Sequence, residues 1–167
     1  MRGSLARLLG GHGHERVSSS WLGRLPEGWH LHNDVTVGEL GERIDHVIVG
    51  PAGVFAVCAK NVSGNVWVGA SGVRVNGHAT DFVQASLTEA RLAARMLSAA
   101  LERPIEVRPV LAILADGWTI QAPCTDVFIG APRGVRDWLG RLPAVLTPGD
   151  VSAIATAAGQ PSTWETD

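Results

Sequence analysis

A chain of 167 residues is long enough for one compact domain with a buried core, and two domains of that total length would each be marginal. Hydrophobic residues make up 46% of the composition and charged residues 18%, which excludes a disordered or fibrous chain. The formal net charge of -2 supplies no global positive field, so any binding of nucleic acid must rely on a local basic surface.

The cysteines and the apolar segments indicate a reduced, non-membrane environment. Cys58 and Cys124 are far apart and form no Cys-x-x-Cys pair, so they suggest neither a disulfide framework nor a structural zinc site. The apolar stretch at residues 5–9 is too short for a signal peptide, and no run approaches the length of a membrane span. We expect a cytoplasmic protein without membrane contact, whose oligomeric state the sequence leaves open.

The N-terminal part of the chain predicts a short helix followed by a strand. Apolar spacing over residues 15–25 suits a helix that stops at Pro26. Residues 29–37 alternate between apolar and polar, which predicts a half-exposed strand. The side chains expected on its apolar face are Trp29, Leu31, Val35 and Val37.

Two buried strands are predicted next. Residues 44–49 and 54–59 are apolar, β-branched runs, and the Gly50-Pro51-Ala52-Gly53 segment between them favours a tight hairpin. Weaker strand patterns follow at residues 65–68 and 72–75, the second before the Asn76-Gly77 turn signal. We expect the sheet to begin as a meander.

Residues 82–101 carry the clearest helical pattern, because their apolar side chains recur at spacings of three and four. The opposite face of this helix carries Gln84, Thr88, Arg91 and Arg95. Strands at residues 107–114 and 127–129 and helices at residues 135–142 and 150–158 complete the pattern. The order predicts an α/β fold with a mixed central sheet flanked by helices.

We predict a single domain over residues 10–158, preceded by an N-terminal segment at residues 1–9. Residues 159–167 are expected to form a loose C-terminal tail, although they include Trp164.

Several stretches, taken together, resemble the nuclease-related domain (NERD) family. They are Gly13-His14-Glu15, the segment from Trp29 to Asp34, the run from Ile44 through Asp45 to Phe55, Lys60-Asn61, Gln84, and Arg108-Pro109-Val110-Leu111. The resemblance covers most of residues 10–115. The family is a branch of the PD-(D/E)XK nuclease-like fold, which implies a restriction-endonuclease-like αβββαβ core.

The resemblance also implies a catalytic site. It assigns Asp45, at the start of one central strand, as a metal ligand, and Lys60, on the next strand, as the residue that orients or stabilises the attacking hydroxide. In such sites Mg²⁺ or Mn²⁺ activates a water that hydrolyses a DNA phosphodiester. A strand-end acid satisfied by turn amides is the structural alternative for Asp45. A solvated lysine, or an ion pair with Asp45, is the alternative for Lys60.

Cys58 departs from the family pattern, which has a carboxylate at this degenerate position, two residues before the lysine. Strand alternation puts residues 58 and 60 on one face, but a thiol is a soft ligand poorly suited to Mg²⁺. Cys58 could be an apolar filler, a metal ligand or a reactive thiol, and the frequent burial of free cysteine favours the filler.

Glu15 matches the family's N-terminal acid, and we hypothesise that it replaces the lost carboxylate as a metal ligand. An exposed glutamate that interacts with the helix dipole explains Glu15 equally well. Gln84 matches a family position and could line the substrate side of the site. Arg91 and Arg95 could bind phosphate there, although an ordinary polar helix face is the commoner explanation.

Two hypotheses follow for the function. In the first, the chain is a DNA endonuclease or phosphodiesterase dependent on Mg²⁺ or Mn²⁺, with a weakened site formed by Asp45, Lys60, Glu15 and Gln84. In the second, it is a pseudo-nuclease that binds nucleic acid or a protein without hydrolysis and without a cofactor.

Overall fold

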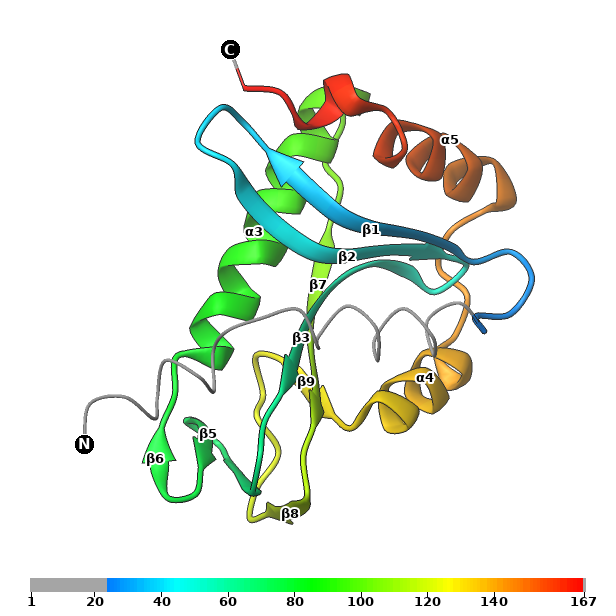
Figure 1. The fold of residues 1–167 in the computed structure, drawn as a ribbon. Helices are drawn as coiled ribbons and strands as arrows, with labels where there is room; N and C mark the ends of the chain where they lie inside the picture. Colours follow the sequence, from blue (N-terminus) through cyan, green and yellow to red (C-terminus); the bar gives the residue numbers. More distant parts are fainter. Residues whose placement is uncertain (1–23, 167) are drawn as a thin grey trace.

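The computed structural model describes residues 24–166, and Figure 1 shows their arrangement. The predicted helix at residues 15–25, with Glu15, lies outside the described residues except for its last two positions. The strands are β1 (His30–Val37), β2 (Glu42–Gly50), β3 (Gly53–Asn61), β4 (Asn65–Gly69), β5 (Gly72–Val75), β6 (His78–Ala79), β7 (Val107–Leu114), β8 (Gly117–Ile120) and β9 (Phe128–Gly130). The helices are α3 (Phe82–Leu101), α4 (Pro132–Arg141), α5 (Pro148–Ala158) and the 3₁₀ helix η1 (Pro161–Trp164).

The central sheet has five strands in the order β1-β2-β3-β7-β9. β1, β2 and β3 are antiparallel neighbours, whereas β7 runs parallel to β3 and β9 runs parallel to β7. The predicted hairpin between β2 and β3 is present, and Gly53 in its turn has a φ of 130° that other residues rarely adopt. The predicted α/β fold with a mixed sheet between helices is therefore confirmed.

Helices cover both faces of this sheet, and the side chains of β3 alternate between them. Val54 and Ala56 pack in the cluster that contains the apolar side of α3, while Phe55 and Val57 pack with α4. Figure 1 shows α3 running along the sheet and α4 on its other side. Complete burial of one large side chain such as Phe55 stabilises the fold by roughly 1.5–3 kcal/mol, so these layers fix the position of β3.

A second, smaller sheet forms beyond the end of β3, in the order β6-β5-β4-β8. The strands predicted at residues 65–68 and 72–75 lie in this sheet and do not continue the central meander. β8, which lacks a clear sequence pattern, pairs parallel to β4. The apolar sides of β4 and β5 pack with Phe82 at the start of α3, and this contact closes one end of the core.

The strand β1 does not keep its apolar residues on one face, contrary to the prediction. Leu31 packs in the α4-side cluster, whereas Val35 and Val37 pack in the α3-side cluster. Asp34 lies between them in the left-handed region with a φ of 54°. A left-handed residue turns the following side chains away from the regular alternation, which explains the change of face.

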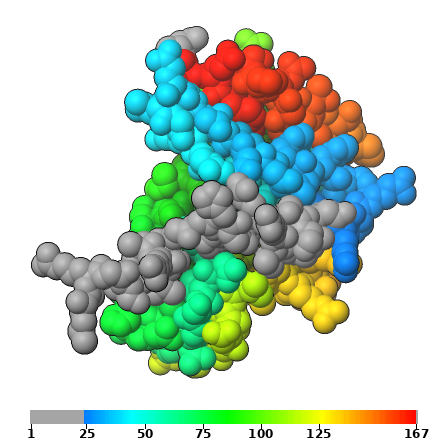
Figure 2. Space-filling model, in the orientation of Figure 1, coloured from blue at the N-terminus to red at the C-terminus, as the bar shows by residue number. Residues whose placement is uncertain are grey.

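The C-terminal segment, predicted to be a loose tail from residue 159, is folded against the core as far as Trp164. This side chain is 5% exposed, and its Nε1 donates a hydrogen bond of 2.9 Å to the Ala158 carbonyl. The Gly38 N–H donates to the Trp164 carbonyl at 2.8 Å, which ties the end of β1 to η1. Figure 2 shows these two segments against each other on the molecular surface. The prediction was wrong because a buried tryptophan gains more from packing than a short terminal segment loses in entropy.

Candidate metal and catalytic site

β2 and β3 separate from each other at the end of their ladder. Their last paired residues are His46 and Val57, so Asp45 and Cys58 occupy the next opposite positions, just beyond the pairing. From there β2 stays paired with β1, and β3 stays paired with β7. The two central strands therefore diverge and form a fork, with Asp45 on one arm and Cys58 on the other.

Carboxylates take up backbone hydrogen bonds that the fork leaves without a strand partner. The Ala59 N–H donates to Asp45 Oδ2 at 3.0 Å, and the Asp45 N–H donates to Glu89 Oε2 at 3.3 Å. A buried N–H without a partner costs about 1–3 kcal/mol, so these bonds hold both acids at the fork. The structural alternative for Asp45 expected turn amides, whereas the Ala59 N–H belongs to β3, and it uses only one of the two carboxylate oxygens.

Glu89 reaches the fork from the middle of α3. It follows Ser86 by three residues and precedes Ala93 by four, and both of these residues are fully buried. Residues at these spacings share one face of a helix, so Glu89 lies on the face that covers the sheet. On the same face, Ser86 Oγ donates a hydrogen bond of 3.3 Å to the Val110 carbonyl of β7. Packing of α3 on the sheet thus carries an acid to the fork.

Asp45, Cys58 and Glu89 form one compact group of potential ligands. One ligand atom from each residue lies within 4.8 Å of the ligand atoms of the other two. Cys58 is fully buried, and the two acids are half-buried. Within residues 24–166, no other three cysteine, histidine or acidic residues lie close enough together to share a metal ion.

The environment of this group disfavours negative charge. Burial, followed by the neighbouring charge of Asp45, raises the pKa of Glu89 to about 7. Burial also raises the pKa of the Cys58 thiol, and the charges of Glu89 and Asp45 raise it further. The thiol donates a hydrogen bond to the Glu89 carboxylate. This bond lowers the pKa of Glu89, but by less than burial and the charge of Asp45 raise it. A cation held between the three residues would stabilise the ionised forms of Glu89 and Cys58.

Lys60 supplies positive charge beside the group. It is half-buried on β3, two residues beyond Cys58, and its charge lowers the pKa values of both Cys58 and Glu89. Its Nζ lies 5.3 Å from the centroid of the Phe82 ring, a cation–π contact that holds the ammonium near the start of α3. The ammonium therefore acts electrostatically on the group from one side.

The remaining predicted site residues are not in this group. Gln84, Arg91 and Arg95 are exposed on α3. At 3.6 residues per turn they project roughly 120–160° around the helix from Glu89, away from the face that meets the sheet. Their predicted roles, like that of Glu15 outside the described residues, stay predictions.

Sequence reasoning missed Glu89, although the sequence contained a signal for it. The acid interrupts the apolar stripe of the 82–101 helix, between Ser86 and Ala93. A charged residue on the buried face of a helix is costly unless it has a partner, and this makes it a candidate for a site. Its convergence with Asp45 depends on how α3 crosses the sheet, which spacing alone does not give.

The central sheet is mixed, and its diverging strands β2 and β3 place Asp45 opposite Cys58, two residues before Lys60. This is the arrangement of restriction-endonuclease-like domains. The family model for the nuclease-related domain matches residues 10–114, which is more than half of the chain. The chain therefore belongs to the nuclease-related domain family, as predicted. Comparisons with curated proteins and with solved structures found no match. Among the described helices, none combines the length and apolar character needed to cross a membrane.

The residues at the fork fit a divalent cation, but not equally well for every metal. The facing carboxylates of Asp45 and Glu89 are hard oxygen donors, which suit Mg²⁺, Mn²⁺ and Zn²⁺. The Cys58 sulfur, in the same group, is a soft donor and fits Mg²⁺ poorly. A cation at this position thus agrees with the family, while the third donor differs from the usual oxygen.

Proposed function

We propose that this protein is a metal-dependent nuclease that hydrolyses DNA phosphodiesters at the fork between β2 and β3. The observation that carries the proposal is the convergence of Asp45 and Glu89. Glu89 supplies the carboxylate that the family pattern places at position 58. The earlier hypothesis assigned this replacement to Glu15, and Glu89 is now the better-supported candidate because it touches the Asp45 backbone.

Each residue has a distinct part in the proposed reaction. Asp45 and Glu89 hold the cation, and the Ala59 and Asp45 N–H groups fix the orientation of their carboxylates. When bound, the metal polarises the phosphodiester and lowers the pKa of a water ligand. Lys60 stabilises the negative charge that develops on the attacking oxygen and on the phosphate, because its ammonium is held beside the cluster.

The test is cleavage of supercoiled and linear DNA by the purified protein with Mg²⁺, Mn²⁺ or Zn²⁺. We expect Asp45→Asn and Glu89→Gln to reduce cleavage by at least about 100-fold, and Lys60→Ala to reduce it by a similar factor, the size found when one group that stabilises transition-state charge is removed. Glu106→Gln, at an exposed glutamate, is the matched control and should retain full activity. Cleavage that survives in Asp45→Asn and Glu89→Gln would assign the activity to other residues.

The same assay tests the predicted contribution of the exposed face of α3. Removal of a phosphate contact weakens binding and reduces its salt dependence, so Arg91→Ala and Arg95→Ala should raise KM with little change in kcat. Gln84→Ala belongs to the same series. Unchanged KM in all three variants would remove this face from the substrate interface.

A pseudo-nuclease that binds nucleic acid without hydrolysis is the second candidate. The complete burial of Cys58 at a position where the family has a carboxylate favours it. It predicts salt-sensitive retention of DNA by the wild type without cleavage, and cleavage in a Cys58→Asp variant. Cleavage by the wild type would rule it out.

A further inference from the structure

The sulfur of Cys58 lies close to the carboxylate oxygens of Asp45 and Glu89, so this side chain does more than fill the core. Strand alternation places Val54, Ala56 and Cys58 on the α3 side of β3, where an aliphatic side chain would complete the packing equally well. Instead the Sγ atom lies within 4.8 Å of ligand oxygens of both Asp45 and Glu89. This position is where a third ligand of a shared cation would lie.

The three donors come from three elements that are held rigidly relative to one another. Asp45 is fixed by the Ala59 N–H, and Glu89 is fixed by the Asp45 N–H. Cys58 is fixed within β3, which is paired with β7 on its other side at this position. A site whose ligands are positioned before the metal arrives binds it with less loss of entropy.

We infer that the fork selects a thiophilic divalent cation of the zinc class, bound by the Cys58 thiolate and the carboxylates of Asp45 and Glu89. The inference rests on the proposed function for the placement of a cation at this group, and it goes further in naming the metal class and its third ligand. Binding forms a metal–sulfur bond, and the proton of the thiol, together with the proton of Glu89 where that carboxyl is still protonated, passes to the solvent. Three anionic ligands are then balanced by the divalent cation together with the Lys60 ammonium.

The chemistry of the donor set supports this choice. Zinc is commonly held by three protein ligands in catalytic sites, with a fourth position left for water or substrate, and it accepts both sulfur and carboxylate donors. Magnesium prefers oxygen donors in octahedral geometry and gains little from a thiol. One substitution, a cysteine in place of a carboxylate, therefore changes the preferred metal while leaving a site that is able to activate water.

The test uses the metal-free full chain titrated with Co²⁺, which occupies zinc sites and shows a sulfur-to-cobalt charge-transfer absorption when a thiolate is bound. We expect this absorption in the wild type and in Cys124→Ser, the matched control at the second cysteine. Zn²⁺ should displace Co²⁺ at stoichiometric concentration, and a large excess of Mg²⁺ should not. Two results with the wild type would each overturn the inference without any variant. One is cobalt that binds without the charge-transfer absorption, and the other is cobalt that Mg²⁺ displaces as readily as Zn²⁺ does.

The variants Cys58→Ser and Cys58→Ala then test the ligand itself. We expect both variants to lose the absorption. Loss of an outer-shell partner weakens metal binding by roughly 10- to 100-fold, and loss of a direct ligand should weaken Zn²⁺ binding by more than that. Circular dichroism verifies that the variants fold. Zinc affinity equal to that of the wild type in a folded Cys58→Ala variant contradicts the inference.

The outcomes separate the metal inference from the proposed nuclease activity. DNA cleavage in Mg²⁺ by a protein that shows no cobalt–sulfur absorption would overturn the inference and leave the nuclease proposal standing. The absorption in a protein that cleaves no DNA with any of the metals would support the metal site and overturn the nuclease proposal.

Discussion

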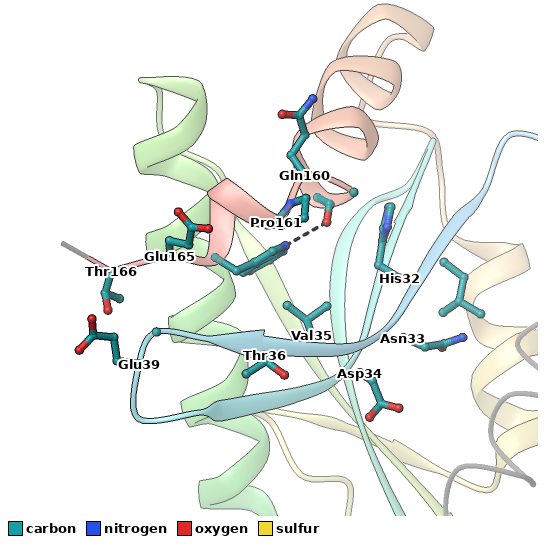
Figure 3. Close-up of a pocket in the computed structure, with 15 residues that line it drawn as sticks. His32, Asn33, Asp34, Val35, Thr36, Glu39, Gln160, Pro161, Glu165 and Thr166 are labelled. Atoms are coloured by element: carbon teal, nitrogen blue, oxygen red, sulfur yellow. Dashed lines mark hydrogen bonds between the residues drawn. The ribbon is translucent and has the colours of Figure 1, made fainter.

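Two polar regions of this molecule differ in the residues that form them and in how their charged groups are stabilised. A hollow of about 860 Å³ lies beside β1 at the edge of the sheet, where His32 and Val35 point toward the C-terminal segment that carries Gln160 and Pro161 (Figure 3). The group of Asp45, Cys58 and Glu89 lies under α3, and none of these three residues lines the hollow. The hollow is thus separate from the place where potential ligands converge.

The charges in the two regions are satisfied differently. Beside the hollow, Asp34 forms an ion pair with Arg43, and both side chains are exposed, so water stabilises them as well. At the fork, Asp45 raises the pKa of Glu89 and burial raises it more. Among the described residues, a cysteine and two acids converge as potential metal ligands only at the fork, so we place the chemistry there and regard the hollow as a consequence of how the C-terminal segment packs.

The largest effect on folding is expected from Trp164, which lines the hollow. Trp164→Ala should lower the free energy of unfolding by about 3–5 kcal/mol, because it removes a large buried side chain and the hydrogen bond from Nε1. Urea denaturation of the metal-free protein measures the loss. Metal binding and DNA cleavage per folded molecule should be unchanged, since Trp164 is not part of the fork.

Trp67→Ala is the matched control, because Trp67 is a half-buried tryptophan in the small sheet. Its loss of stability should be clearly smaller. If Trp164→Ala abolishes cleavage while the protein stays folded, the hollow takes part in the chemistry and the separation of the two regions is wrong.

A second, smaller effect is expected at the fork, on the pH dependence of stability. The pKa of Glu89 is raised from 4.5 to about 7 in the folded state. Between these values the folded protein keeps a proton that the unfolded chain has lost, so stability falls as pH rises through this window. Glu89→Gln removes this loss and should be more stable than the wild type by up to about 3 kcal/mol above pH 7, in the absence of metal.

The measurement is urea denaturation of both proteins with a chelator, over a pH series from below 4.5 to above 7. The buried His46, whose pKa is lowered by burial, changes stability in the opposite direction, but it is present in both proteins and cancels in the difference. Glu106→Gln serves as the control and should follow the wild type. Parallel curves for the wild type and Glu89→Gln would show that Glu89 ionises freely and weaken the case for a strained, cation-binding group.

The same two regions show how far the sequence alone leads. Local patterns predict β2, β3 and the long helix correctly, because the hairpin turn and the apolar stripe of α3 are determined by neighbours in the chain. They place Asp45, Cys58 and Lys60 on adjacent strands for the same reason. Glu89 was missed because its partner is distant in the sequence and depends on how α3 crosses the sheet.

Tertiary contacts account for the other differences. The change of face in β1 depends on the left-handed conformation of Asp34, which nothing in the alternating pattern reveals. The order of the C-terminal segment depends on Trp164, which is buried in a cluster with residues of α3 and α5. Periodicity describes one element at a time, so it does not predict where two elements meet.

The smallest effect is expected at His32, in the hollow. Its Nε2 is buried and has no hydrogen-bond partner among residues 24–166, and burial lowers its pKa. His32→Leu should stabilise the protein by about 1 kcal/mol, near the lower end of the cost of an unsatisfied buried group because the side chain is only half-buried. The gain should grow as pH falls below about 6.5, since the unfolded chain then takes up a proton that the folded histidine resists. Urea denaturation on both sides of that pH, with exposed His78→Leu as the control, measures it. A loss of stability in His32→Leu at every pH would mean that the ring nitrogen has a favourable role, and the hollow would then rival the fork as a binding site.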